Sequence, residues 1–440
     1  MKNKKWMAIL LGGIMAASLA APCSVSAAEK TTLTFWHAMG GTNGEVLQQI
    51  VDDFNASQDE IEVKAEYQGT YDDTITKLKA AMQSDSGLPD VCQMYDVGTK
   101  FMYDSGAVIP VEDKFESTGY DKSSVMEVIS SYYTVDGKQY AMPFNVSTPM
   151  LYYNKDVFEA AGLDPETPPT TYDEVLEDAK KIVESGAAPV GYSQAIYGWF
   201  FEQQLAGLGV TYGNNDNGRK EAVTAVDFDS NGGGLKVFDM WKKLYDSGYF
   251  EDYGTTTADT QTAFFSGQVG MIIESTAILK NAVDSSPFEV GTGYLPRIEQ
   301  NDEGGVIIGG GSLWLTDTGN EANEDAAWKF IEYITTPDVQ AKWSMGTGYF
   351  AINEKAYETE DMKAYLKENP NFETAINQLK DSPVNCNTAG VLSGVQTEAR
   401  LTFNEIMPQV YDGKLTTQDA VDQLAASVNK AIENYNESIK

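Results

Sequence analysis

Hydrophobic positions near the start of the chain switch repeatedly between the spacing of a strand and that of a helix. Apolar residues alternate with polar ones at 33–36 and 61–67 and run together at 91–95, which predicts three strands. Between them, apolar residues recur every three or four positions at 46–54 and 71–82, which predicts two helices. This β-α-β-α-β order is typical of a mostly parallel sheet with helices on its faces.

The same alternation resumes after Pro143 and predicts a second α/β unit. Helices are expected at 172–184 and 233–245, and strands at 269–274 and 289–295. A chain of 440 residues exceeds what one hydrophobic core usually supports, so two domains agree with its length.

The last part of the chain is predicted to be mostly helical. After Gly310, the pattern predicts a strand at 313–316 and a helix at 326–334. The final helix has a clear start signal, because Thr416 is followed three residues later by Asp419, which resembles a capping box. By contrast, the Asn, Asp and Gly residues of 212–218 predict a plain surface loop.

Residues 1–27 have the three-part pattern of a secretory signal. Lysines at positions 2, 4 and 5 precede an apolar stretch at 6–21, and small residues end the segment. The stretch is shorter than the roughly 20 residues that a membrane span needs. We therefore expect cleavage after Ala27 or Ala28 and export to the periplasm or the extracellular space, with lipid attachment through Cys23 as the alternative.

Acidic residues dominate the charge of the chain. There are 65 Asp and Glu residues against 31 Lys and Arg residues, for a formal net charge of -34. A surface this acidic repels nucleic acid and anionic lipid, so we expect neither as a partner.

The inventory of reactive side chains excludes most catalytic sites. His37 is the only histidine, which excludes triads and zinc sites built on several imidazoles. Cys92 and Cys386 offer no disulfide framework, and Cys92, in an apolar segment, is expected to be an inert buried thiol. The glycines at 309–311 fit neither a phosphate loop nor a dinucleotide fingerprint. We therefore expect that the protein binds no metal or cofactor and is not an enzyme. The alternative from another functional class is a secreted glycosidase that uses paired carboxylates.

Four segments predict a ligand cleft. Residues 35–37, 67–71, 93–99 and 143–149 combine aromatic, hydroxyl and glycine residues within or just after the expected strands. Ligands of open parallel sheets bind outside the carboxyl ends of the strands, where these segments fall. The segments therefore predict a polar cleft, with His37 as part of its wall or as a hydrogen-bonded structural residue.

These segments also resemble the family 1 extracellular solute-binding proteins, the ligand-capturing components of ABC importers. The similarity is carried by Phe35-Trp36-His37, Tyr67 to Tyr71, Gln93 to Thr99, Pro143 to Lys155, Gly162 to Glu166, Ile307 to Gly310, Ser312-Leu313-Trp314 and Thr347-Gly348-Tyr349. It runs in order from about Thr31 to the C-terminal helix, and it is greatest for the phosphate-ester branch of the family.

The resemblance implies a periplasmic-binding-protein-like type II α/β fold, with two hinged lobes and the ligand between them. Residues 28–143 and 296–345 would form the first lobe, and residues 144–295 and 346–440 the second. It further implies a monomer that captures glycerol 3-phosphate or a glycerophosphodiester without reaction and passes it to an ABC permease in the membrane.

The resemblance also assigns ligand-binding residues. Tyr71 and Asp96 would hold the glycerol hydroxyls, although the family usually has glutamate where Asp96 stands. The phosphate would be surrounded by Ser147, Ser275, Gly310, Tyr349 and Arg400. Tyr172, at a position where the family tends to have tryptophan, would form an aromatic wall, and Trp36, His37 and Trp199 are further candidates for the cleft wall.

Two alternatives remain open for these residues. Arg400 is one of three arginines and lies on a partly apolar helical stretch, so it fits either a phosphate site or a structural ion pair. Aromatic residues would equally form the platform of an oligosaccharide site, for which Trp36, Trp199, Trp343, Tyr172 and Tyr349 are candidates. Trp241, Trp314 and Trp328 are expected in the core.

Overall fold

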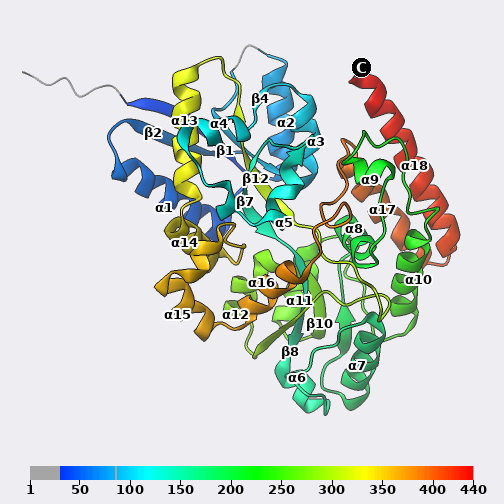
Figure 1. The fold of residues 1–440 in the computed structure, drawn as a ribbon. Coiled ribbons are helices and arrows are strands. Elements are labelled where there is room, and N and C mark those ends of the chain that lie inside the picture. The colour runs from blue at the N-terminus through cyan, green and yellow to red at the C-terminus, as the bar shows by residue number, and fades with distance from the viewer. Residues whose placement is uncertain (1–29, 85–86, 440) are drawn as a thin grey trace, which may run out of the picture.

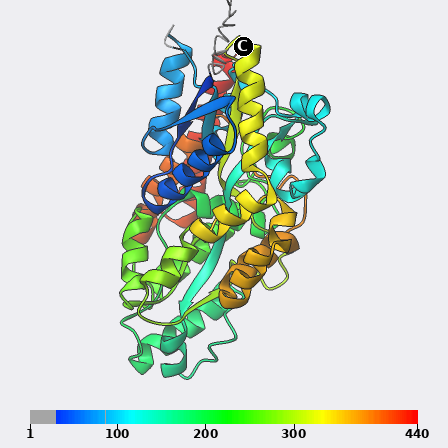
Figure 2. The same cartoon turned by 90° about the vertical axis from the view of Figure 1, so that its left-hand side faces the viewer.

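The computed structural model describes residues 30–84 and 87–439. The expected signal at 1–27 and Cys23 lie outside these residues. Figure 1 shows two α/β lobes, each built around one sheet, with the C-terminal helices along one side. Turned by 90°, the molecule is elongated, with one lobe above the other (Figure 2).

The first lobe is built on a six-stranded sheet. Its strands are β1 (Thr31–His37), β2 (Ile61–Tyr67), β3 (Val91–Tyr95), β4 (Val108–Ile109), β7 (Met142–Ser147) and β12 (Gly309–Thr316). Strand β1 pairs in parallel with β2 and β3, as the alternation of strands and helices predicted. Strand β12 returns from much later in the chain and pairs antiparallel with β3, β4 and β7.

The second lobe is built on a four-stranded sheet with the order β11-β8-β10-β9. These strands are β8 (Pro149–Asn154), β9 (Val190–Ser193), β10 (Val269–Ser275) and β11 (Val290–Gly293). Strand β8 pairs antiparallel with β10 and β11, and β10 pairs in parallel with β9. A two-stranded hairpin of β5 (Thr134–Val135) and β6 (Lys138–Gln139) lies apart from both sheets.

Helices account for most of the remaining chain. Up to the second sheet, they are α1 (Gly41–Ser57), α2 (Tyr71–Met82), α3 (Thr99–Asp104), α4 (Glu112–Thr118) and α5 (Glu127–Ser130). Between the first strand of that sheet and β12, they are α6 (Lys155–Ala160), α7 (Tyr172–Ser185), α8 (Gly198–Gly207), α9 (Asn214–Gly218), α10 (Gly233–Asp246), α11 (Thr257–Phe265) and α12 (Leu279–Ser285). After β12 come α13 (Glu321–Ile334), α14 (Pro337–Thr347), α15 (Glu360–Glu368), α16 (Asn371–Asp381), α17 (Gln396–Tyr411) and α18 (Thr417–Ser438).

The chain first crosses between the sheets at Thr148, which joins β7 to β8. Its carbonyl accepts from the Thr276 N–H at 2.8 Å, and its own N–H donates to the Thr276 hydroxyl at 3.1 Å. The Gln378 amide of α16 donates to the adjacent Pro149 carbonyl at 2.7 Å. These bonds hold the crossing point in place, whereas the lobe limits implied by the resemblance stay predictions.

Two hydrophobic cores stabilise the two lobes. Trp314 and Trp328 are buried in the core of the first lobe and Trp241 in that of the second, as predicted. Trp343, a candidate for a sugar platform, is fully buried as well. Cys92 is also fully buried, and burial raises the pKa of its thiol to about 12, so the expected inert thiol is confirmed.

Reciprocal capping boxes define the starts of α2, α7 and α18. The predicted capping box at Thr416 and Asp419 is present, with the Asp419 N–H donating to the Thr416 hydroxyl at 3.1 Å. Thr70 starts α2 and Thr171 starts α7 with the same reciprocal arrangement.

The segment at 212–218 differs from the predicted surface loop. Asn215, Asp216 and Asn217 all have left-handed backbone angles, and Asn217 is buried. The Asn217 carboxamide oxygen accepts from the N–H groups of Tyr212 and Gly213 at 2.8 and 2.9 Å, and its nitrogen donates to the Cys386 carbonyl at 3.0 Å. Short polar side chains tolerate this backbone region, so the Asn-rich sequence forms a tight structural turn.

Candidate ligand cleft between the lobes

Tyr71 and Asn145 meet at the carboxyl ends of the first-lobe strands. Tyr71 begins α2, and its ring stacks on Tyr95 with centroids 5.1 Å apart. The Asn145 amide nitrogen donates to the Tyr71 hydroxyl at 2.6 Å, while its oxygen accepts from Gln93 at 2.6 Å. Burial raises the Tyr71 pKa well above its usual value, so the phenol stays a neutral donor.

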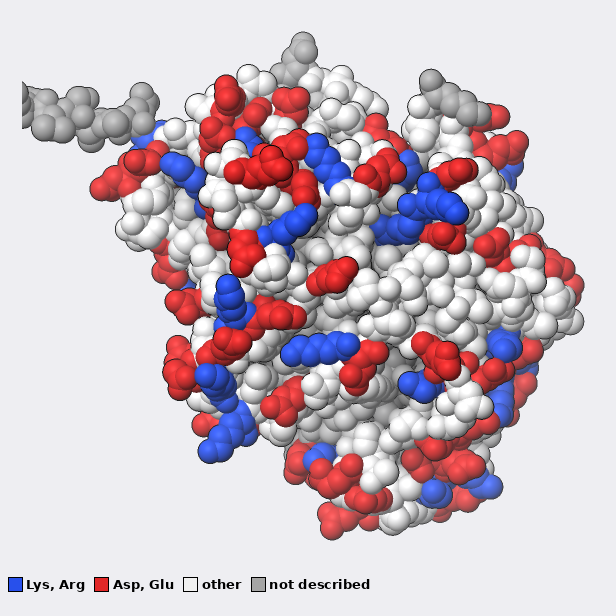
Figure 3. Space-filling view, viewed as in Figure 1, with Lys and Arg blue, Asp and Glu red and all other residues white. Residues whose placement is uncertain are grey.

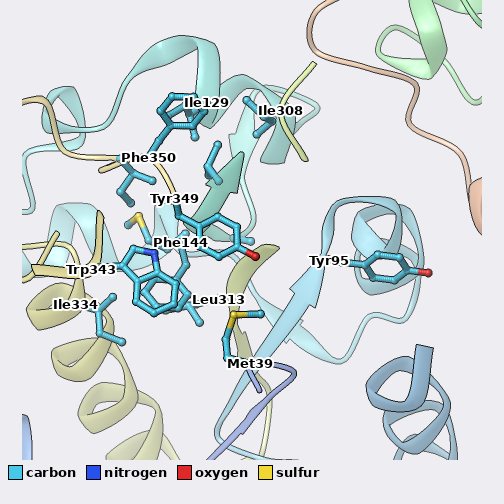
Figure 4. Close-up of a cluster of buried hydrophobic side chains, with 14 of the residues drawn as sticks. Met39, Tyr95, Ile129, Phe144, Ile308, Leu313, Ile334, Trp343, Tyr349 and Phe350 are labelled. Atoms are coloured by element: carbon cyan, nitrogen blue, oxygen red, sulfur yellow. The ribbon is translucent and has the colours of Figure 1, made fainter. Parts of the chain in front are cut away.

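Tyr349 is positioned by a stack of aromatic rings. Its ring lies 5.6 Å from Trp343 at an interplanar angle of 7°, and Trp343 in turn stacks on Phe144 at 4.6 Å (Figure 4). The preceding Gly348 has a φ of 94°, which lets the chain turn out of α14. The Phe350 N–H then donates to the Val146 carbonyl at 2.9 Å, which ties Tyr349 beside β7.

Two glycines of β12 allow close approach of other groups. Gly309 pairs with Ser147 across the strands, and Gly310 has a φ of 92°. A Cβ at Gly310 would lie 1.9 Å from the Asn145 carbonyl oxygen, and one at Gly309 would lie 2.7 Å from the Trp199 ring. The sequence places glycine here because any side chain would collide.

A buried ion triad joins the two lobes. Arg400 of α17 donates from Nε to Glu202 Oε1 at 2.8 Å and from Nη2 to Glu202 Oε2 at 2.7 Å. The same Nη2 donates to Asp96 Oδ2 at 2.8 Å. Arg400 and Glu202 belong to helices of the second lobe, whereas Asp96 follows β3 of the first. The predicted phosphate-binding arginine is therefore already engaged by two carboxylates.

The electrostatics of the triad follow from its burial. Burial alone would lower the pKa of Arg400, but the Asp96 and Glu202 carboxylates outweigh it and hold the pKa well above its usual value. Burial raises the pKa of Glu202, which Arg400 and the Gln396 amide offset in part. With one cation and two carboxylates, the triad carries a net negative charge when all three groups are ionised.

A second contact between the lobes lies beside the triad. The Tyr95 hydroxyl and the Thr397 hydroxyl are 2.6 Å apart, and Tyr95 also bonds to Asp72 at 3.0 Å. Thr397 lies on the same helix as Arg400, so one end of α17 contacts the first lobe twice.

Ser275 and its neighbour Glu274 lie at the end of β10. The Ser275 hydroxyl oxygen accepts from the Ala277 N–H at 3.1 Å, which leaves its own hydrogen to donate. Glu274 is 4% exposed, and its carboxylate accepts from the Ser275 N–H at 2.7 Å and from Gln261 at 3.0 Å. Burial raises the Glu274 pKa to about 7.

Trp199 is buried beside Gly309, and its indole N–H has no hydrogen-bond partner among the described residues. Buried donors of this kind are normally satisfied by a ligand or by water. The place of Trp199 in the cleft wall stays a prediction.

The other predicted wall residues bond to neighbours within their own lobes. Tyr172 is 2% exposed in the second-lobe core, where its hydroxyl accepts from Gln204 at 2.8 Å. Trp36 donates to Glu66 at 3.0 Å on the first sheet. His37 is buried and its Nδ1 accepts from the Met39 N–H at 3.3 Å; burial lowers its pKa to about 4, so it is neutral at physiological pH.

The structure thus brings together most of the predicted ligand residues: Tyr71, Asp96, Ser147, Gly310, Tyr349 and Arg400. Sequence reasoning missed Asn145 as a partner of Tyr71 and Glu202 as the main partner of Arg400. One signal for Glu202 exists, because it directly follows the apolar residues Trp199, Phe200 and Phe201 of α8, where a charged residue needs a buried partner.

Acidic side chains are scattered over the face in Figure 3, with basic ones between them. Within residues 30–84 and 87–439, no His, Cys, Asp and Glu residues form a group suited to hold a metal ion. In the same part of the chain, no helix combines the length and the apolar character that crossing a membrane requires.

Two hinged α/β lobes with buried polar side chains between them define the class of two-lobed solute-binding proteins. The chain belongs to the bacterial extracellular solute-binding proteins, whose family model matches residues 49–374. It is thus a solute-binding protein of an ABC importer, and the expected type II α/β fold is confirmed.

Several relatives have named ligands. The chain is 30% identical over 417 residues to the sn-glycerol-3-phosphate-binding periplasmic protein UgpB of Escherichia coli K12, covering 93% of this chain and 94% of that one. A cyclic α-maltosyl-1,6-maltose-binding protein of Arthrobacter globiformis has a TM-score of 0.76 at 26% identity, covering 92% of this chain and all of that one. UgpB of Mycobacterium tuberculosis, in complex with glycerophosphocholine, has a TM-score of 0.79 at 20% identity, covering 93% of this chain and all of that one.

Proposed function

We propose that this protein captures glycerol 3-phosphate or a glycerophosphodiester outside the membrane and passes it to an ABC permease. The relatives named as glycerol-3-phosphate-binding proteins support this ligand class, because they align over nearly the whole chain. The observation that carries the proposal is the buried Arg400 guanidinium, which reaches Asp96 of the opposite lobe at 2.8 Å.

The proposed contacts divide the ligand between the lobes. In the first lobe, the Tyr71 hydroxyl donates to one glycerol hydroxyl, and the Asp96 carboxylate accepts from another. The phosphate lies among donors from both lobes: Ser147, Ser275, Tyr349, the Gly310 backbone and Arg400. A ligand that bonds to both lobes favours the closed arrangement, which the permease recognises.

The ion triad determines how a phosphate would enter. Glu202 holds Arg400 through two bonds within the second lobe, whereas Asp96 accepts only one bond across the gap. A phosphate oxygen therefore replaces Asp96 at Nη2 more readily than it replaces Glu202. The two carboxylates repel a phosphodiester, with one negative charge, less than a dianionic monoester.

Isothermal titration calorimetry with glycerol 3-phosphate, glycerophosphocholine and maltotriose tests the ligand class. We expect saturable binding of the phosphate esters and at least about tenfold weaker binding to Arg400→Lys, which keeps the charge but loses the planar fork. Arg297→Lys, at an exposed position, is the matched control and should bind like the parent. Equal affinity of Arg400→Lys and the parent would refute the phosphate site.

An oligosaccharide is the second candidate ligand. Carboxylates paired to an arginine beside aromatic rings also suit sugar hydroxyls, and Arg400 is already neutralised by Asp96 and Glu202. If titration released heat only with maltotriose, an oligosaccharide would be favoured as the ligand, and the assignment of the fold would still hold.

We further propose that the protein acts as an exported monomer that does not react with its ligand or bind nucleic acid. The named relatives are binding proteins, and those of Escherichia coli are periplasmic. Chromatography of the ligand after incubation with the protein tests the secreted glycosidase alternative, which would release a hydrolysis product.

A further inference from the structure

A cavity of about 570 Å³ is lined by helices and loops of the second lobe and by the stretch that leads from β11 toward β12. Its walls are the loop 168–170 before α7, the segment 292–298 at the end of β11, the stretch 304–306 and one face of α16. Small-molecule sites usually have volumes of about 300–1,000 Å³, so the cavity has the size of a ligand site. The residues described along its wall include none that the resemblance assigns to the ligand.

Most polar side chains of this wall are already bonded within the protein. Partners are present for Thr170, Gln204, Thr292, Thr374, Gln378, Asp381 and Ser382. Gln204, for example, donates to Tyr172 at 2.8 Å and accepts from Trp241 at 2.6 Å, which uses both ends of its amide. These groups shape the cavity and are not available to bind a ligand strongly.

Among the charged side chains that line the cavity, Arg297 is the exception. Over residues 30–84 and 87–439, its guanidinium forms no hydrogen bond and no ion pair, unlike Arg219 and Arg400. Asp302 lies close enough for the charge of Arg297 to lower its pKa, but burial dominates and raises that pKa. The Asp302 carboxylate accepts instead from the Glu299 N–H at 2.7 Å. Arg297 therefore offers its donors to an occupant of the cavity.

The surfaces around Arg297 are apolar. Pro168, Pro169, Leu295, Pro296 and Ile298 line the same cavity. An arginine without an ion pair beside proline and aliphatic side chains suits a molecule with an acidic group at one end and an apolar body.

We propose that this cavity is a second binding site, which takes a small organic anion whose acidic group pairs with Arg297. The apolar body of the anion packs against the prolines of the wall. A single acidic group fits better than several, because Asp381 also lines the cavity and the protein as a whole is strongly acidic. This site is separate from the proposed ligand cleft and does not depend on its ligand.

Fluorine NMR of 4-fluorobenzoate with the mature chain tests the site, with 4-fluorobenzyl alcohol as the uncharged counterpart. We expect saturable binding of the benzoate and weakening by about tenfold or more in Arg297→Gln, because a charge-assisted bond is lost. Lys414→Gln removes the same charge at an exposed lysine and should leave binding unchanged. Ile298→Trp fills the cavity and should abolish binding of the benzoate.

Three results would overturn the second site. The first is an absence of saturation by 4-fluorobenzoate up to its solubility limit. The second is equal binding to Arg297→Gln and the parent, which would place the benzoate elsewhere, for example at Arg400. The third is equal weakening in Arg297→Gln and Lys414→Gln, which would show an effect of overall charge alone.

Discussion

Glu274 makes the stability of the protein depend on pH. Its carboxyl group is 4% exposed and accepts hydrogen bonds from Gln261 and from the Ser275 N–H. No lysine or arginine of the described residues forms an ion pair with it. Burial therefore disfavours the ionised form and raises its pKa from 4.5 to about 7.

The direction of the effect follows from proton binding. Between pH 4.5 and about pH 7, the folded protein holds a proton on Glu274 that the unfolded chain has released. The free energy of unfolding therefore falls as the pH rises through this range. At about 1.4 kcal/mol per pKa unit, the shift from 4.5 to about 7 corresponds to about 3 kcal/mol lost above pH 7.

Urea unfolding of the parent and of Glu274→Gln measures the contribution of Glu274 to the pH dependence of the free energy of unfolding. The glutamine keeps an acceptor for the Ser275 N–H, and the Gln261 amide can turn to accept from the new NH₂ group. We expect Glu274→Gln to gain about 3 kcal/mol relative to the parent when the pH is raised from below 4.5 to above 7.

Glu62→Gln, at an exposed position of β2, controls for the loss of one negative charge. Its difference from the parent should stay nearly constant over the same pH range. If the difference between Glu274→Gln and the parent were also constant, Glu274 would ionise normally and the argument from burial would be wrong.

Three further substitutions test the close packing at Gly310, the ion triad and the cap of α18. Gly310→Ala places a Cβ 1.9 Å from the Asn145 carbonyl oxygen, and calorimetry should show destabilisation of at least about 2 kcal/mol. Glu202→Gln weakens the two charge-assisted bonds to Arg400 and leaves Arg400 in a neutral pair with Asp96, so urea unfolding should show a loss of about 1.5–3 kcal/mol. Thr416→Ala removes the α18 cap and should cost about 1 kcal/mol, whereas no measurable change would contradict the capping role.

Periodicity predicted the elements well because burial imposes it directly. The predicted strand at 61–67 and helix at 71–82 have the observed limits of β2 and α2. The left-handed turn before Arg219 was not predicted, because the Asn-rich sequence is equally typical of an exposed loop. Contacts with Cys386, far along the chain, decide between the two outcomes.

The candidate site was predicted only in part. Motifs pointed to Tyr71, Asp96 and Arg400, and the apolar neighbours of Arg400 indicated burial. Its pairing with Glu202 joins residues 198 positions apart, and the sequence signal at Glu202 indicates a buried partner without identifying which residue it is. The resemblance pointed to an aromatic wall at Tyr172, which is 2% exposed and bonds to Gln204, and this role stays a prediction.

The unequal bonding of Arg400 suggests how the two lobes could respond to a ligand. Glu202 holds one edge of the guanidinium, at Nε and Nη2, within one lobe, so the group is already oriented before the lobes meet. Asp96 adds one bond from the other lobe, a contact that a phosphate oxygen or a sugar hydroxyl would have to match. A ligand that bonds to Arg400 alone would displace Asp96 and so remove a bond between the lobes. Only a ligand that also bonds to first-lobe groups such as Tyr71 replaces that bond and favours the closed arrangement.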